Sequence, residues 1–236
     1  MGCVLFSRPA DDVTLNYLHY FSKELVNLSS SLGHKTINKE KDKANKKEII
    51  SLIKKQRPNL IMFNGHGSPE EICGHKREMI VSSNYNPEVL KETITYSLSC
   101  SSAAVLGRKV VDVGAISFIG YEFDFALGKD PDSEASPRHD RIAKFFLEPS
   151  NALFSSLIEG NNVKDSVERA KIMMMKNVWH LNTTKSFPEA IYYAPFLFGN
   201  YLGLIAHGDQ EASIENEHQR HSLVRPARRE IDPERC

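Results

Sequence analysis

Short apolar runs alternate with amphipathic segments along the chain. Four runs have the length and composition of short buried strands: residues 4–6, 59–64, 92–98 and 115–120. The segments between and after them have apolar residues at steps of three and four, the period of a helix with one buried face. This alternation predicts an α/β fold, a three-layer α/β/α sandwich around a mostly parallel sheet.

The helical segments carry recognisable start and stop signals. The first extends from Asp11-Asp12 to a stop at Gly33, and Asn45 with Glu48 has the spacing of a capping box that opens a second, short helix. Further helices are expected at residues 102–107, 141–147, 151–159 and 164–179, and a last strand at about 201–207.

Polar stretches divide the chain. Residues 35–47 are rich in lysine and read as a solvated edge or loop, and residues 126–140 read as a long exposed loop. We expect one domain at residues 1–210 and a polar, flexible C-terminal tail at residues 211–236. Residues 190–208 are uncharged but interrupted by proline and glycines, so we expect buried core rather than a membrane span.

Composition limits the partners. The chain has 236 residues, and 30 basic side chains balance 30 acidic ones, so nothing in the net charge points to nucleic acid or to an anionic membrane. Its 4 cysteines are scattered, and no basic-then-apolar signal peptide precedes them. We therefore expect a cytoplasmic protein in a reducing compartment.

Two residues that can do chemistry follow consecutive predicted strands. His66 comes after residues 59–64 within Asn64-Gly65-His66-Gly67, and Cys100 comes after residues 92–98. In parallel sheets, ligands and chemistry gather at the carboxyl ends of strands. An imidazole and a helix beginning directly after the cysteine would lower the pKa of its thiol, and the N–H groups of Gly67 and Cys100 can form an oxyanion hole. A single buried Cys or His is usually structural, but their joint placement favours catalysis.

These residues carry a resemblance. Asn64-Gly65-His66-Gly67, and thirty residues later the segment 97–103 around Cys100, resemble the CHAT branch of the caspase-like cysteine peptidases, the superfamily of caspases, separase, gingipains and clostripain. The likeness continues through the strand at residues 115–120, the helical residues 145–170 and the closing residues 194–209. It covers about residues 55–210.

The resemblance implies a caspase-like fold and a cysteine endopeptidase that needs no cofactor or metal, with Cys100 as nucleophile and His66 as base and leaving-group acid. It implies no third side chain of fixed identity. It places Glu122 and Asp124 as candidates for a first-subsite pocket that selects Arg or Lys. It further implies a protein substrate, activation by a regulatory or sensor protein, and a role in prokaryotic signalling or antiviral defence, with residues 126–140 and the tail as candidate switch segments.

Three alternatives remain open at this stage. His66, Cys73, His75 and Cys100 are possible zinc ligands, although their spacing fits no standard zinc site. A catalytically inactive caspase-like scaffold that binds a partner is the second, and residues 173–175, three methionines, are the kind of surface a partner uses, although core packing suits a helix equally. A hydrolase with Ser99 or Ser101 as nucleophile lacks the Gly-x-Ser-x-Gly elbow and ranks last.

Overall fold

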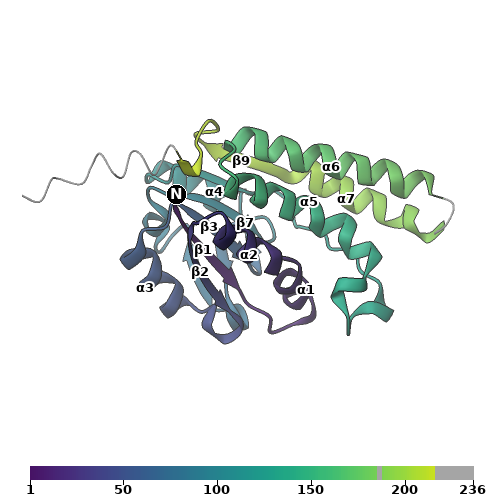
Figure 1. Cartoon of the computed structure of the whole chain (residues 1–236), viewed down its shortest axis with the longest axis horizontal. Helices are drawn as coiled ribbons and strands as arrows, with labels where there is room; N and C mark the ends of the chain where they lie inside the picture. The colour runs from purple at the N-terminus through teal and green to yellow at the C-terminus, as the bar shows by residue number, and fades with distance from the viewer. Residues whose placement is uncertain (185–187, 216–236) are drawn as a thin grey trace, which may run out of the picture.

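A six-stranded sheet forms the centre of the computed structural model, which describes residues 1–184 and 188–215 (Figure 1). The strand order is β2-β1-β3-β7-β8-β9, and the first five strands are parallel while β9 is antiparallel. The bounds are β1 Cys3–Arg8, β2 Lys35–Glu40, β3 Leu60–Asn64, β7 Ile94–Leu98, β8 Ser117–Tyr121 and β9 Leu204–Gly208. The mostly parallel sheet predicted from the sequence is confirmed.

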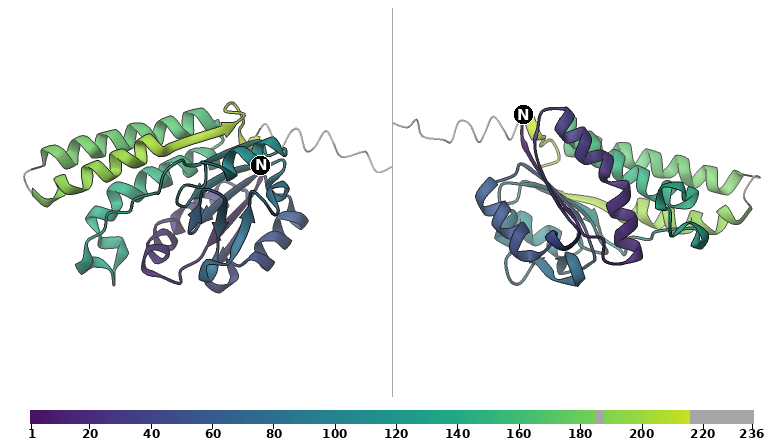
Figure 2. Two further views of the ribbon diagram at one scale, coloured as in Figure 1. Left: turned by 180° about the vertical axis from the view of Figure 1, so that it is seen from behind. Right: turned by 60° about the horizontal axis from the view of Figure 1, so that its bottom comes forward.

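Helices cover both faces of the sheet, which makes three layers (Figure 2). On β1, Val4 and Phe6 enter the core beneath one helical layer and Leu5 enters the other, because successive side chains of a strand point to opposite faces. The larger layer contains α1 Val13–Phe21, α2 Lys23–Ser31, α5 Arg141–Ile158, α6 Val163–Thr183 and α7 Ala194–Gly203. The smaller one contains α3 Lys46–Gln56 and α4 Leu106–Asp112.

Two regions of the larger helical layer differ from the expected helices. The segment that ends at Gly33 is two helices, broken at Ser22, whose hydroxyl donates to the carbonyl of Leu18 at 2.7 Å and accepts from Arg8 Nε at 2.8 Å. Residues 141–158 form one helix, α5, because Pro149 is tolerated inside it where two helices were expected. The predicted cap at Asn45 is present, since its side chain accepts from the N–H of Glu48 at 3.0 Å.

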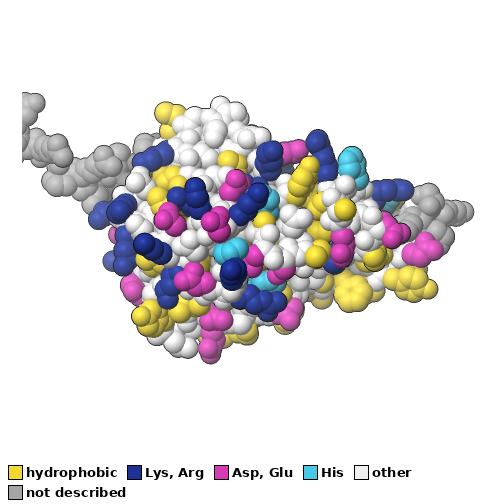
Figure 3. Space-filling model, turned by 90° about the horizontal axis from the view of Figure 1, so that it is seen from below, with side chains coloured by type: hydrophobic (Ala, Val, Ile, Leu, Met, Phe, Trp, Pro, Cys, Tyr) yellow, Lys and Arg dark blue, Asp and Glu magenta, His cyan; other side chains and the backbone are white. Residues whose placement is uncertain are grey.

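The uncharged stretch at residues 190–208 forms the end of a short 3-10 helix, α7 and β9. Leu197 and Leu204 are buried, but Phe196 and Leu202 are exposed, so only one face of α7 belongs to the core. Among the described residues, none of the helices has the length and apolar character needed to cross a membrane. Figure 3 shows acidic, basic and histidine side chains interspersed on the face seen from below.

The expected tail begins inside the folded unit. Ala212 and Ile214 are buried. The carbonyl of Ala212 accepts from the N–H of Val163 at 3.0 Å, and a side chain at Gly2 would collide with Ile214, so this segment packs on the folded unit. Residues 216–236, which include Cys236, lie outside the described residues. The division at residue 210 therefore stays a prediction.

Candidate active site

His66 and Cys100 follow neighbouring strands and lie at the same carboxyl edge of the sheet. β3 and β7 are parallel neighbours in which Asn64 is paired with Leu98, and His66 and Cys100 each come two residues after that pair. The N–H of Gly65 donates to the carbonyl of Leu98 at 3.3 Å, so the two chains stay together beyond the strands. Two residues that are 34 positions apart in the sequence therefore come to the same edge of the sheet.

The backbone of Gly67 lies close to the turn that contains Cys100. A Cβ added at Gly67 would lie 2.9 Å from the carbonyl oxygen of Cys100 and 2.9 Å from Ser99 Oγ, a separation that real Cβ atoms do not show. Only glycine fits there without movement. Within the described part of the chain, the N–H of Cys100 donates to no acceptor, so it is available to a ligand.

Asp12 is a site residue that the sequence interpretation missed. Its Oδ2 lies 2.5 Å from His66 Nε2, and its Oδ1 accepts from the N–H of Leu15 at 2.8 Å as the N-cap of α1. Burial raises the pKa of Asp12, but the hydrogen bonds from Leu15 and His66 outweigh it and hold that pKa below its ordinary value. The sequence signal was an acidic pair, Asp11-Asp12, a few residues after β1, the strand next to β3, and this pair also fits a helix start.

The neighbouring Asp11 anchors the antiparallel hairpin sheet that follows His66, formed by β4 Gly67–Ser68, β5 Glu71–Cys73 and β6 Met79–Ser82. Asp11 Oδ1 lies 3.3 Å from His75 Nδ1, and Asp11 Oδ2 accepts from the N–H of Lys76 at 2.8 Å. The two adjacent acids therefore hold both His66 and the turn beyond it.

The surroundings of the Cys100 thiol disfavour its ionisation. Burial raises its pKa, and the negative charge of Asp124 raises it further. Its Sγ lies 4.0 Å from the carbonyl oxygen of Phe125, and it makes no hydrogen bond with His66. The thiol in this conformation is therefore neutral at neutral pH.

The helix expected directly after Cys100 is absent, so that prediction is wrong. α4 begins only at Leu106, and Ser101 has φ 51° in the left-handed region. The N–H groups of Ser101 and Ala103 donate to the carbonyls of Phe123 and Tyr121 at 3.1 and 3.0 Å. The turn thus pairs with the end of β8 instead of coiling, and no helix N-terminus lowers the pKa of the thiol.

The two proposed pocket acids have different surroundings. Asp124 is exposed, and its Oδ1 accepts from Ser101 Oγ at 2.6 Å beside Cys100. Glu122 Oε1 is instead 3.2 Å from Arg108 Nη2 on α4. The structure therefore brings Asp124 to the candidate nucleophile and pairs Glu122 with a cation, and their role in substrate binding stays a prediction.

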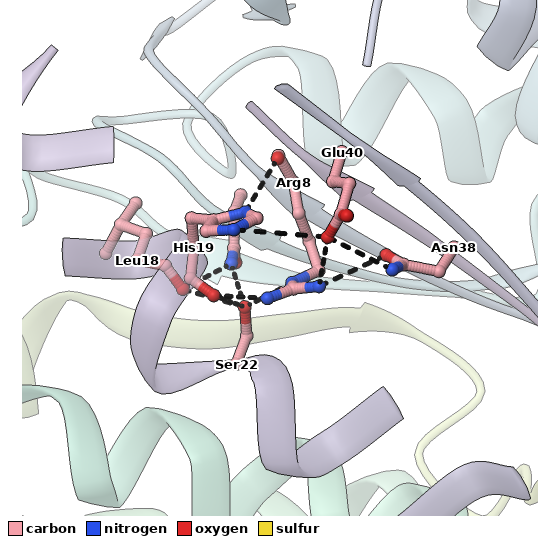
Figure 4. A network of polar contacts seen from close by, with 7 residues as sticks. Arg8, Leu18, His19, Ser22, Asn38 and Glu40 are labelled. Atoms are coloured by element: carbon pink, nitrogen blue, oxygen red, sulfur yellow. Dashed lines mark hydrogen bonds and ion pairs between the residues drawn. The ribbon is translucent and has the colours of Figure 1, made fainter. Parts of the chain in front are cut away.

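A buried arginine supports the His66 side of the site (Figure 4). Arg8 is 1% exposed at the end of β1, and its guanidinium donates to Ser22, to the carbonyl of His19, and to Asn38 and Glu40 on β2. Ser22 Oγ also accepts from Asn64 Nδ2 at 2.9 Å. This network ties α1, which Asp12 caps, to the end of β3, which precedes His66.

The metal alternative gains no support from the geometry. In the part of the chain that the structure describes, no three His, Cys, Asp or Glu side chains come together as a metal site. Cys73 is buried in β5, where burial and then the charge of Glu71 raise its pKa to about 11, and His75 pairs with Asp11.

Comparison with known proteins identifies the fold. No protein-family model and no curated protein matches the chain. Among solved structures, the Arg-specific cysteine proteinase gingipain R (RgpB) aligns with TM-score 0.51 and 12% identity over 89% of this chain. The chain has a caspase-like fold. A complex of the pro- and mature domains of RgpB from Porphyromonas gingivalis aligns with TM-score 0.52 and 11% identity, also over 89% of this chain.

This likeness establishes the fold of the chain. The caspase-like arrangement expected from the sequence is confirmed, while membership of the CHAT branch stays a prediction. The chain spans about half the length of both solved structures, 46% and 47%.

Proposed function

We propose that the protein is a cysteine endopeptidase in which Cys100 is the nucleophile, His66 the general base and acid, and Asp12 the residue that positions His66. The observation that carries this proposal is the placement of His66 and Cys100 two residues beyond the paired Asn64 and Leu98, with the Asp12 carboxylate on His66 Nε2. Nucleophile, base and orienting acid then come from three adjacent strands, β7, β3 and β1.

The Asp12 carboxylate sets the tautomer of His66. An ionised carboxylate only accepts hydrogen bonds, so His66 Nε2 carries the hydrogen and Nδ1 keeps its lone pair. Nδ1 takes the proton of Cys100, and the thiolate attacks the carbonyl carbon of the scissile peptide bond. The N–H groups of Gly67 and Cys100 donate to the oxyanion that forms.

Collapse of this intermediate breaks the C–N bond. The His66 imidazolium gives its proton to the leaving amine, and a thioester to Cys100 remains. His66 then removes a proton from water, the resulting hydroxide attacks the thioester carbonyl, and the thiol is restored when Cys100 leaves and is reprotonated. Each proton that His66 takes up is passed on to the amine or back to Cys100, so the cycle needs no further group.

The raised pKa of Cys100 and its missing hydrogen bond to His66 support an inactive resting state. Phe125, whose carbonyl contacts the thiol, directly precedes residues 126–140, so a protein partner that moves this segment would release Cys100. We propose such a regulatory partner, in a cytoplasmic signalling or defence pathway of a prokaryote, as the CHAT resemblance implies.

The substrate proposal rests on Asp124. Its exposed carboxylate beside Cys100 favours a basic residue, Arg or Lys, on the acyl side of the cut bond. The solved relative RgpB is described as Arg-specific. Glu122 contributes to such a pocket only if a substrate displaces Arg108 from it.

A caspase-like scaffold without activity is the second candidate function, and the neutral resting thiol favours it. Peptidyl acyloxymethyl ketones with Arg, Lys, Asp or Leu next to the warhead separate the two, with intact mass as the readout. An adduct on wild type that is lost in Cys100→Ala and His66→Ala supports the peptidase. Cys73, which lies outside the site, is the internal control. Equal labelling of His66→Ala contradicts the dyad, and a folded wild type that no probe labels, alone or with candidate partners, favours the scaffold.

A further inference from the structure

The outward face of α6 is apolar where a solvent-exposed helix is ordinarily polar. Residues on a helix are about 100° apart, so Ile172 lies opposite the buried face of α6. That buried face consists of Val163, Ser166, Ala170, Met174 and Leu181. Ile172 is 47% exposed, and its neighbours on the same side, Met175 and Trp179, are 38% and 69% exposed.

An open hollow of about 800 Å³ lies along this face. It is bounded by Phe145 of α5 on one side and Tyr201 of α7 on the other, and along α6 it extends from Glu168 to His180. In Figures 1 and 2 the helices α5, α6 and α7 extend beyond the sheet. Contiguous apolar surface of this kind marks an interaction site.

The charges on the face are arranged symmetrically about Ile172. Glu168 lies four residues before Ile172 and Lys176 four residues after it, and both are exposed on the same side of the helix. Neither forms an ion pair with any described residue. The nearby Lys171 is engaged, because its ammonium lies over the ring of Tyr201, 5.3 Å from the centroid.

We infer that this face of α6 binds a second copy of the chain in a two-fold symmetric dimer. A two-fold interface needs a surface that is complementary to itself. With the axis near Ile172 and the two helices antiparallel, each Glu168 meets the Lys176 of the other copy. Ile172 and Met175 form the apolar centre between these pairs, and a net charge of zero adds no long-range repulsion between copies.

Charge reversal tests this pairing. Sedimentation of the full chain across a concentration series should show a monomer–dimer equilibrium for the wild type. Glu168→Lys and Lys176→Glu each place two like-charged pairs in the interface and should raise the dissociation constant at least about tenfold. The double variant Glu168→Lys/Lys176→Glu restores both pairs and should return to within about threefold of wild type. Lys55→Glu, an exposed charge on α3, is the matched control and should change nothing.

Trp179 gives a second, independent readout because it is the single tryptophan of the chain. Its emission should shift to the blue as the concentration of wild type rises through the dissociation constant, and Ile172→Asp should abolish both the shift and the dimer. Ile172 is on the surface, so Ile172→Asp should leave the fold intact, and circular dichroism checks this.

Three results would overturn the inference. The first is a wild type that stays monomeric at several hundred micromolar with exposed tryptophan emission. The second is a dimer that tolerates Glu168→Lys and Ile172→Asp. The third is a monomer with blue-shifted emission that moves to the red when residues 216–236 are removed, which would show that the chain covers this face itself.

Discussion

Asp12 performs two separable tasks with its two carboxylate oxygens, and three substitutions distinguish them. Oδ1 caps α1 by accepting from the N–H of Leu15, while Oδ2 holds His66 Nε2. Asn and Ser retain a capping oxygen at this position, whereas Ala does not. None of the three supplies a carboxylate to His66.

The expected magnitudes follow from these contacts. Loss of the cap in Asp12→Ala should lower the free energy of unfolding by about 1 kcal/mol, and Asp12→Asn and Asp12→Ser should stay within about 0.5 kcal/mol of wild type. In Asp12→Asn the amide can donate to Nε2, which moves the ring hydrogen to Nδ1 and removes the base. Losses of up to about 10⁴-fold are known for such a change, and because the Asp12 side chain is 37% exposed we expect about 100-fold in kcat/KM.

The assay combines urea unfolding with cleavage, or probe labelling, at pH 7 on the same preparations. Activity should fall about equally in all three variants while only Asp12→Ala loses stability. If activity follows stability instead, with Asp12→Asn and Asp12→Ser near wild type, Asp12 is a helix cap and does not position His66.

Three further predictions concern the site and its stability. Gly67→Ala should lower the free energy of unfolding by about 1–3 kcal/mol, because its Cβ would lie 2.9 Å from the carbonyl oxygen of Cys100. Gly199→Ala, whose Cβ would have nothing within 4 Å, should raise that free energy by up to about 1 kcal/mol. Equal effects of the two variants in urea unfolding would contradict this. Asp124→Asn removes a charge that raises the pKa of Cys100, so alkylation of Cys100 by iodoacetamide at pH 7 should be faster, and an unchanged rate by intact mass would refute the assignment. The folded pKa of Asp12 lies below its ordinary 3.8, so its contribution to stability is full above 3.8 and is lost as pH falls through the lower folded value. The stability difference between wild type and Asp12→Ala, followed from pH 6 to pH 2, should therefore shrink over that window, and a constant difference would argue against it.

The sequence predicted the parts of the fold that local patterns determine. The apolar runs that became β3, β7 and β8, and the Asn45 cap of α3, depend on residues close together in the chain. The placement of His66 and Cys100 at the same edge of the sheet followed because parallel strands end at one edge, whatever the details of the loops.

Contacts between distant segments could not be predicted in this way. Asp12 is 54 residues from His66, and only the adjacency of β1 and β3 brings them together. A helix was expected at residues 102–107, but the N–H groups of Ser101 and Ala103 donate to carbonyls at the end of β8 instead, and α4 begins only at Leu106. The methionines at residues 173–175 separate by helix face, since Met174 is buried and Met175 is exposed.

The most direct test of the central claim is identification of new N-termini by mass spectrometry, after digestion of an unfolded protein library with wild type and with Cys100→Ala. Each digest is run alone and with candidate partner proteins. We predict new termini, preceded by Arg or Lys, that are produced by wild type and absent with Cys100→Ala. Termini that persist with Cys100→Ala, or their absence with a folded wild type under every condition, would contradict the assignment of Cys100 as a peptidase nucleophile.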